Sequence, residues 1–173
     1  MKASKPNACV CPVCKKHPMP PRCGAMRSTC PPGPGPGCGC ILAGIHAQLT
    51  NGENFILEDG DGVVFDKVLN QQGSAVIYDP ATGVFTLTQK ANYLVNWSIA
   101  AEGSQTAPYV RFALQVNGAV NSGLTMPVSV GAGGGSALIS AAPGTALRLI
   151  NNTKDRVRLG PEASITITTI SKE

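Results

Sequence analysis

The sequence predicts an all-β fold, a jelly-roll sandwich of about ten strands, preceded by an extended N-terminal connector. Short runs rich in Val, Ile and Thr are separated by turn residues, and only 14% of the chain is charged. Glycine and proline are abundant, at 20 and 14 of 173 residues. A chain of this length can build one domain with its own core. We therefore expect many short strands joined by tight turns.

The clearest strands are 93–99 and 110–116, in which apolar and polar residues alternate so that the apolar ones share a face. The residues expected to pack in the core or at a trimer axis are Tyr93, Val95, Trp97, Ile99, Phe112 and Leu114. Further strands are predicted at 45–49, 74–78, 84–87, 124–130, 136–141, 146–151 and 164–170. Turn signals such as Asn117-Gly118 separate them. The glycine-rich run 131–135 is predicted to be a flexible loop.

The connector is expected to be residues 1–40, and the jelly-roll head residues 41–173. All seven cysteines lie in the connector: Cys9, Cys11, Cys14, Cys23, Cys30, Cys38 and Cys40. This segment has too little apolar bulk for a core, so its order must come from cross-links, a metal or a partner surface. It ends in the run 31–37, where glycine recurs every second residue. Collagen needs glycine at every third position, so we interpret the run as a stiff spacer of roughly 20 Å.

Disulfide bonds are the favoured chemistry for these cysteines. Neighbouring cysteines in Cys-x-Cys cannot easily bond to each other, and an odd number leaves at least one thiol for another chain. Zinc bound by Cys9, Cys11, Cys14 and His17 is an alternative, because the spacing suits a metal site. A redox role for Cys11-Pro12-Val13-Cys14 is a third, although the motif lies in a tail. We predict no resident metal or cofactor.

Charge is divided unevenly between the two parts. Residues 1–40 hold six bases and no acid, whereas residues 41–173 hold eight bases and ten acids. The connector has no aromatic residue for stacking on bases, so no nucleic-acid partner is expected. A basic connector that meets the acidic head of another subunit is a simpler use of the asymmetry. We also expect no membrane span and no signal peptide, and hence synthesis in a cytoplasm.

No arrangement of residues indicates an enzyme. The histidines are His17 in the connector and His46 in the first strand of the head, and no nucleophile motif accompanies either. The acidic run 58–62 could hold calcium, but a solvated turn is the simpler interpretation. The run 154–158 is predicted to be a solvated hairpin. We predict a non-enzymatic protein.

The segments 65–68, 74–80, 82–87 and 91–97 resemble the opening strands of trimeric jelly-roll heads of the tumour-necrosis-factor and complement-head class. In that class a Gly-x-Phe strand, here Gly83-Val84-Phe85, precedes an Asn-Tyr strand, here Asn92-Tyr93. A later strand ends in Asn-Gly, here Asn117-Gly118. Residues 41–173 resemble in particular the BclA-like C-terminal domains of exosporium glycoproteins. The connector departs from BclA in lacking long collagen repeats, and is similar to short, disulfide-linked subunits of endospore appendages.

This resemblance implies a homotrimer at the spore surface, exposed to the exterior after mother-cell lysis. It implies a structural, pilin-like subunit of a disulfide-stabilised fibre or surface layer, in which the connectors join trimeric heads head to tail. Its partners would be copies of itself, with other spore-coat or exosporium proteins as the anchor. The alternative function is a trimeric spore-surface adhesin, whose head binds a ligand and whose cysteine-rich tail tethers it.

Overall fold

The structure of the protein, a computed structural model, describes residues 43–52, 55–104, 106–127 and 131–172. All seven cysteines, His17 and the spacer 31–37 lie outside the described residues. The disulfides, the zinc alternative and the domain boundary at residue 40 therefore stay predictions.

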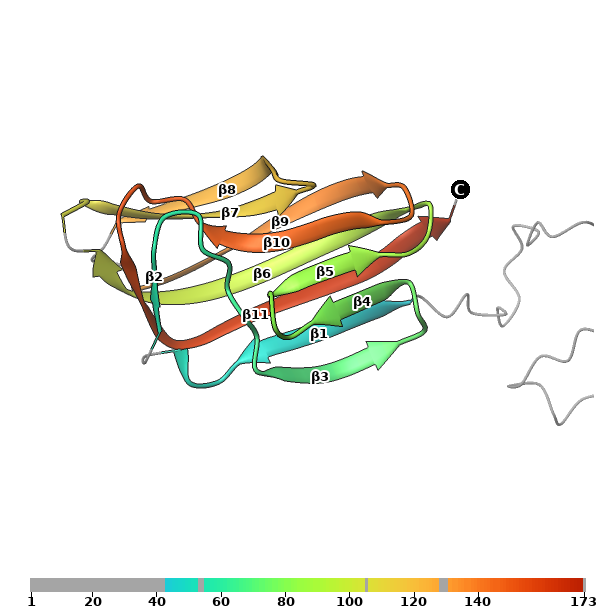
Figure 1. Ribbon diagram of the computed structural model, residues 1–173, viewed down its shortest axis with the longest axis horizontal. Helices are drawn as coiled ribbons and strands as arrows, with labels where there is room; N and C mark the ends of the chain where they lie inside the picture. Colours follow the sequence, from blue (N-terminus) through green and yellow to red (C-terminus); the bar gives the residue numbers. More distant parts are fainter. Residues whose placement is uncertain (1–42, 53–54, 105, 128–130, 173) are drawn as a thin grey trace, which may run out of the picture. The chain divides into compact units, whose positions relative to one another are not determined.

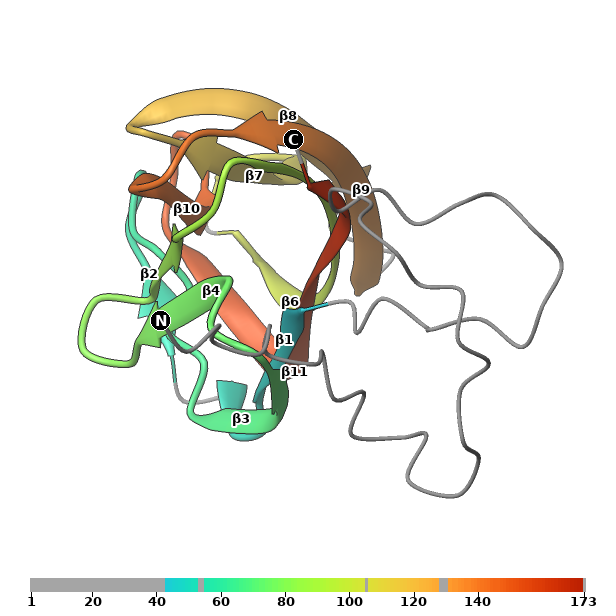
Figure 2. The same cartoon turned by 90° about the vertical axis from the view of Figure 1, so that its right-hand side faces the viewer.

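The described residues form two antiparallel β-sheets that enclose one core, and they contain no α-helix (Figure 1). Sheet A has the order β3-β1-β11-β6-β9, with β2 paired to β11, and sheet B has the order β4-β5-β10-β7-β8. The predicted all-β sandwich is confirmed, and Figure 2 shows its two layers end-on. The strands are β1 Gly44–Leu49, β2 Ile56–Leu57, β3 Lys67–Gln72, β4 Val76–Asp79, β5 Val84–Leu87, β6 Ala91–Ser104, β7 Tyr109–Val116, β8 Ala119–Pro127, β9 Ala132–Ala141, β10 Thr145–Asn151 and β11 Val157–Lys172.

The core lies between the sheets and is built by alternation along the strands. All six residues predicted to pack lie in the core of the single domain, each at most 5% exposed: Tyr93, Val95, Trp97, Ile99, Phe112 and Leu114. The first four come from β6 in sheet A and the other two from β7 in sheet B. They fill the sandwich itself, so none of them is left exposed to line a trimer axis.

A cluster of three aromatic rings closes the core beside β4 and β5. Tyr78 and Phe85 stack with ring centroids 4.4 Å apart, and Phe65 approaches both rings. The Tyr78 hydroxyl accepts from the Phe65 amide at 2.7 Å and donates to the Phe65 carbonyl at 2.9 Å. Burial raises the pKa of this phenol above its usual value. The two hydrogen bonds hold the loop before β3 on the sandwich.

Most of the predicted strands are confirmed, with β5 matching its predicted bounds at both ends. The Asn117-Gly118 turn is also confirmed: both residues have positive φ, 48° and 84°, as a two-residue hairpin turn requires. The strand predicted at 124–130 begins earlier, because β8 spans Ala119–Pro127. β2 and β3 were not predicted. All six residues of β3 are exposed, so it lacks the alternation of a half-buried strand.

The prediction of a loop at 131–135 is wrong for residues 132–135, which belong to β9. These glycines leave room for two large side chains that pack against the inner side of β9. A Cβ at Gly135 would lie 2.4 Å from Cζ2 of Trp97, and one at Gly133 would lie 2.2 Å from the sulfur of Met126. The missing side chains on the inner side of β9 make room for Trp97 and Met126, so these glycines serve packing rather than flexibility.

We expect Gly135→Ala to lower the free energy of unfolding by about 1–3 kcal/mol, because overpacking forces a buried side chain off its rotamer. The Trp97 ring is only 5% exposed and has little room to move away. Ser136→Ala is the control: it lies next in β9 on the outer side and should change stability by less than about 0.5 kcal/mol. Urea unfolding of both variants measures the difference. Equal stability of the two would contradict the packing role of Gly135.

Candidate subunit interface

The outer surface of sheet A carries no charged residue over the middle parts of β1, β11, β6 and β9. In β1, β11, β6 and β9 the buried and outward positions alternate, and the outward ones are small polar or apolar residues. We call this surface the neutral face. Its residues are Gly44, His46, Gln48, Ser164, Thr166, Thr168, Ile170, Asn92, Leu94, Asn96, Ser98, Ala100, Ala132, Gly134, Ser136, Leu138 and Ser140. Charges begin at its margins, at Lys67, Glu102, Arg158 and Glu162.

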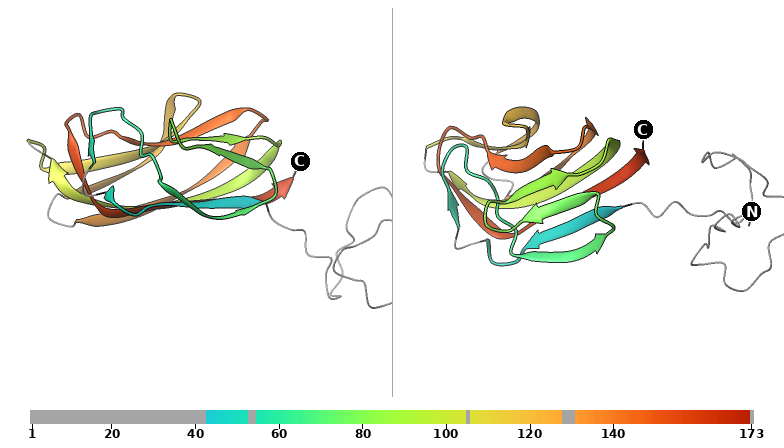
Figure 3. Two further views of the ribbon diagram at one scale, coloured as in Figure 1. Left: turned by 60° about the horizontal axis from the view of Figure 1, so that its bottom comes forward. Right: turned by 45° about the vertical axis from the view of Figure 1, so that its right-hand side comes forward.

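Three exposed apolar side chains lie on neighbouring strands of the neutral face. Leu94 of β6 pairs with Leu138 of β9, and Ile170 of β11 lies beside them. Leu138 is 66% exposed, Ile170 44% and Leu94 36%. By register, this apolar patch is near the end of the sandwich where β1 begins and β11 ends. In Figure 3 this end is marked by the C-terminus of the chain. Clustered exposed apolar residues are typical of a protein–protein contact.

Several polar groups of the neutral face already bond to one another. The Asn92 amide donates to Ser171 Oγ at 2.8 Å and accepts from Ser140 Oγ. Ser98 Oγ and Ser164 Oγ lie 2.8 Å apart and share a hydrogen bond. Polar groups that are satisfied within the sheet lose less when water is removed. The face can therefore be covered by another protein at a modest desolvation cost.

A hollow of about 190 Å³ interrupts the neutral face where β3, β1 and β11 meet. Gly44 and Ile45 contribute to its lining, together with His46, Thr166 and Thr168. A Cβ at Gly44 would lie 2.5 Å from the Ile167 carbonyl oxygen, so this glycine allows the close approach of β1 to β11. His46 thus lies on the rim of a surface hollow, beside its cross-strand partner Thr166.

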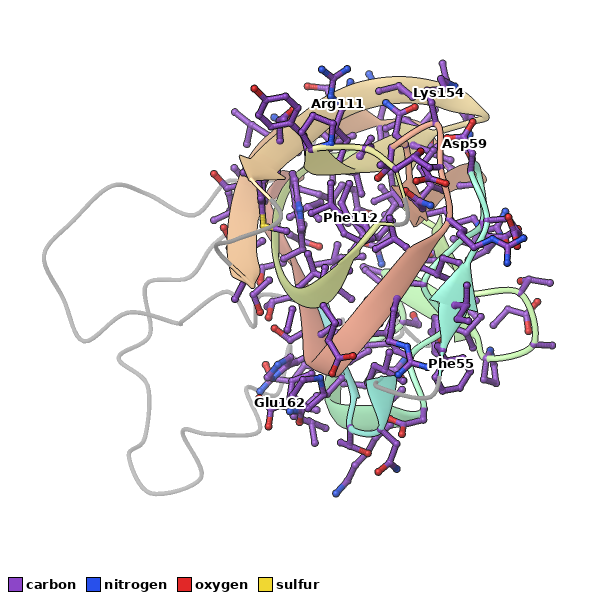
Figure 4. All side chains as sticks on the ribbon, turned by 90° about the vertical axis from the view of Figure 1, so that its left-hand side faces the viewer. Phe55, Asp59, Arg111, Phe112, Lys154 and Glu162 are labelled. Atoms are coloured by element: carbon purple, nitrogen blue, oxygen red, sulfur yellow. The ribbon has the colours of Figure 1, made fainter. Side chains whose placement is uncertain are left out.

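Charged residues gather instead at the far end of the sandwich, opposite the first residue of β1. Figure 4 looks onto this end, where Lys154 lies against Asp59. Their Nζ and Oδ2 atoms are 3.1 Å apart, and this hydrogen bond lowers the pKa of Asp59. Arg156 pairs with Glu58 at 3.5 Å. Such exposed pairs contribute little to stability. They do make this end polar and water-facing, in contrast to the neutral face.

The predicted hairpin at 154–158 is an exposed turn only as far as Arg156, since β11 starts at Val157. Lys154 has a φ of 68°, the left-handed conformation of a tight turn. Two acidic side chains of the run 58–62 make contacts within the head. The Asp61 carboxylate accepts a hydrogen bond from the Glu58 amide, and Asp59 forms an ion pair with Lys154. Within the described residues, no three His, Cys, Asp or Glu residues are arranged to hold a metal. Nor is any helix there long and apolar enough to cross a membrane.

Asp155 gives this end a predictable response to acid. The Thr106 amide donates to its Oδ2 at 2.8 Å, and with the Thr106 hydroxyl and the Arg156 amide it lowers the pKa of Asp155 to about 2. The folded protein therefore holds this carboxylate ionised at a pH where the unfolded chain protonates it. The stabilisation is complete above the unfolded pKa, near 4, and disappears as the pH falls through about 2.

We expect the Asp155→Asn variant to lose less stability than the natural protein between pH 4 and pH 2. Thermal unfolding recorded across this range, with the two proteins compared at each pH, measures the effect. Parallel curves for both proteins would contradict the assignment of acid sensitivity to Asp155.

The fold can now be compared with known proteins. No protein-family model matches the sequence, and no curated protein matches it. The globular domain of zebrafish complement 1qA protein matches with a TM-score of 0.57 at 14% identity, covering 76% of this chain and 99% of that chain. Eiger TNF from S. frugiperda matches with a TM-score of 0.54 at 15% identity, covering 77% and 94%. The domain has the tumour-necrosis-factor-like jelly-roll fold.

PRD1 vertex protein P5 matches as well, with a TM-score of 0.50 at 12% identity, covering 74% of this chain and 96% of that chain. The predicted resemblance to the tumour-necrosis-factor and complement-head class is therefore confirmed at the level of fold. The narrower resemblance to BclA and to spore appendages stays a prediction.

Sequence reasoning identified the inner side of sheet A and missed its outer side. The signal was present, because every outward residue between Asn92 and Ala100 is uncharged. Each strand taken alone is unremarkable in this respect. Only the strand order shows that four such strands lie side by side and make one continuous neutral surface.

Proposed function

We propose that this protein is a non-enzymatic structural subunit of a disulfide-stabilised fibre or surface layer on bacterial endospores. Its TNF-like head gathers three copies through the neutral face. Its connector, residues 1–40, then links one trimer to the next head to tail. Other coat or exosporium proteins anchor the assembly at the spore surface.

The neutral face is the observation that carries this proposal. Monomeric proteins rarely expose a broad uncharged sheet surface to water, whereas protein–protein interfaces are depleted of charged residues at their centre. Other described surfaces of the head do carry charge, including Arg111 and Arg148 in sheet B and the ion pairs of the far end. The neutral face is thus the surface best suited to be covered by another copy.

The position of the chain ends supports a link between trimers. β1 begins and β11 ends at the same end of the head, close to the apolar patch of Leu94, Leu138 and Ile170. Three heads that meet through this patch bring the starts of their three β1 strands together. The cysteines that precede β1 are then held at high effective concentration, which favours bonds between chains.

The connector's charge supports a head-to-tail arrangement. Its six bases are unopposed, whereas the head carries two more acids than bases. Attraction between a basic connector and an acidic head steers one subunit toward the next. A contact between unlike surfaces that does not close on itself produces a filament. Each disulfide then forms from two thiols, with two protons and two electrons passing to molecular oxygen or another thiol oxidant.

The test compares the full chain with a variant in which all seven cysteines are replaced by serine. We expect the oxidised natural protein to form filaments by electron microscopy, and to run as a ladder on denaturing gels that collapses to one band with reductant. The serine variant should stay a soluble trimer in sedimentation. Covalent ladders that persist with reductant, or a serine variant that still forms resistant filaments, would contradict the proposal. A monomeric serine variant would contradict the trimer.

A further inference from the structure

Among the residues of the neutral face, His46 of β1 is the one side chain whose charge changes near neutral pH. We propose that His46 makes the association of the heads sensitive to pH, so that copies associate when this imidazole is neutral and separate when it is protonated. This inference rests on the trimer of the proposed function and adds its regulation.

His46 lies in a row of residues that crosses the middle of the neutral face. It pairs with Thr166 of β11, Thr166 pairs with Asn96 of β6, and Asn96 pairs with Ser136 of β9. His46 is already half-buried in the single head. A copy that covers this row therefore removes water from the imidazole as well.

No carboxylate faces His46 from the strands that flank it. On β3 its partner is Asn70, and the charged residue of that strand is Lys67, a base. On β11 its partner is Thr166, and the acid Glu162 lies four residues, about 13 Å, further along the strand. β1 itself contains no charged residue. Within these strands a protonated His46 has no opposite charge to pair with.

The hollow beside His46 supplies no opposite charge either. Its other polar side chains are all uncharged: Asn70, Gln72, Thr166 and Thr168. Their oxygen atoms can accept a hydrogen bond from the ring, but they leave its charge unbalanced. A few water molecules trapped in about 190 Å³ solvate a charge less well than bulk water does. Protonation therefore costs more free energy in the trimer than in the free head.

A second copy offers no carboxylate from its own neutral face or from the two strands at that edge of the sandwich. Neither β8, Ala119–Pro127, nor β9, Ala132–Ala141, contains a charged residue. The free head thus binds the proton more readily than the trimer does, and by linkage a lower pH favours the free head. The trimer is stable at neutral and alkaline pH and weakens as the pH falls through the range in which histidine is titrated.

The test uses the full chain with its seven cysteines replaced by serine, so that association is reversible. Sedimentation at pH 7.5 and at pH 5.5, at one ionic strength, measures the dissociation constant of the trimer. We expect this constant to rise by about tenfold or more at pH 5.5, because an exposed histidine, with a pKa of about 6.5, is then protonated about ten to one.

Three variants assign the response to one side chain. His46→Gln keeps a neutral polar group at every pH, and it should form a trimer that does not respond to pH in this range. His17→Gln is the matched control, since it removes the other of the two histidines and should keep the full response. His46→Lys carries a permanent charge and should be monomeric already at pH 7.5, with an unchanged circular dichroism spectrum.

The outcomes separate this inference from the proposed function. A serine chain that is monomeric at pH 7.5 overturns the trimer itself. A trimer with the same dissociation constant at both pH values leaves the trimer standing and overturns the switch. The switch is also overturned if His46→Gln responds to pH as its parent does or is a folded monomer at both pH values, if His17→Gln loses the response, or if His46→Lys is still trimeric.

Discussion

Asn96→Arg is expected to convert the trimer into monomers without unfolding the head. Asn96 lies at the middle of the neutral face, with Thr166 on one side and Ser136 on the other. An arginine there would be buried in the trimer without an opposite charge, because the acids of sheet A nearest to it, Glu162 of β11 and Glu102 of β6, lie at the margin of the neutral face. An unpaired charge removed from water costs about 3–5 kcal/mol, and each trimer would contain three.

Asn96→Arg is placed in the serine variant, in which all seven cysteines are replaced and no disulfide can hold the copies together. Sedimentation of this protein measures the loss of the trimer directly. Thr86→Arg is the matched control, since Thr86 of β5 faces outward from sheet B between Ile77 and Ala146. It should leave both the trimer and the circular dichroism unchanged. A trimer that survives Asn96→Arg would show that the copies meet through some other surface.

Asn151→Leu is expected to be the most damaging single change to the head. Asn151 is fully buried at the end of β10, and its amide donates to the carbonyls of Leu57, Glu58 and Asp155 at 2.8–3.1 Å. Its Oδ1 accepts from the Thr153 amide at 3.0 Å. One side chain thus joins the turn after β2 to the turn before β11. Leucine has a similar volume but removes all four of these hydrogen bonds, although the Glu58 carbonyl still accepts from the Asp61 amide.

Each buried group left unsatisfied costs about 1–3 kcal/mol, although relaxation of the two turns recovers part of the sum. We expect a loss of about 3–5 kcal/mol and a fall in the melting temperature of about 10 °C or more. Asn152→Ala, at the next residue and outside this set of bonds, should cost less than about 1 kcal/mol. Calorimetry of both variants decides the matter, and a similar loss in both would refute the role given to Asn151.

The strand that contains Trp97 shows what sequence periodicity can predict and what it leaves open. Alternation along 93–99 correctly puts Tyr93, Val95, Trp97 and Ile99 on one buried face, because neighbouring side chains in a strand point to opposite sides. The same pattern leaves open whether that face meets a second sheet of the same chain or another copy. The structure shows that this face meets sheet B of the same chain, since Phe112 and Leu114 of β7 belong to the same core.

The glycine run shows where local reasoning failed. Consecutive glycines favour a loop by propensity, and the structure makes residues 132–135 a strand because Trp97 and Met126 occupy the space inside them. β3 was missed for the opposite reason. It is polar and exposed throughout, and it exists because β1 offers it backbone partners.

The amino-acid sequence by itself determined the all-β class, most of the strands, the Asn117-Gly118 turn and the residues of the core. Each of these depends on alternation or turn chemistry within a few neighbouring residues. Only the tertiary structure decided the neutral face and the surface hollow where β3, β1 and β11 meet. These depend on strand order and register, which are set by pairing between segments far apart in the chain, such as β1 with β11 and β6 with β9.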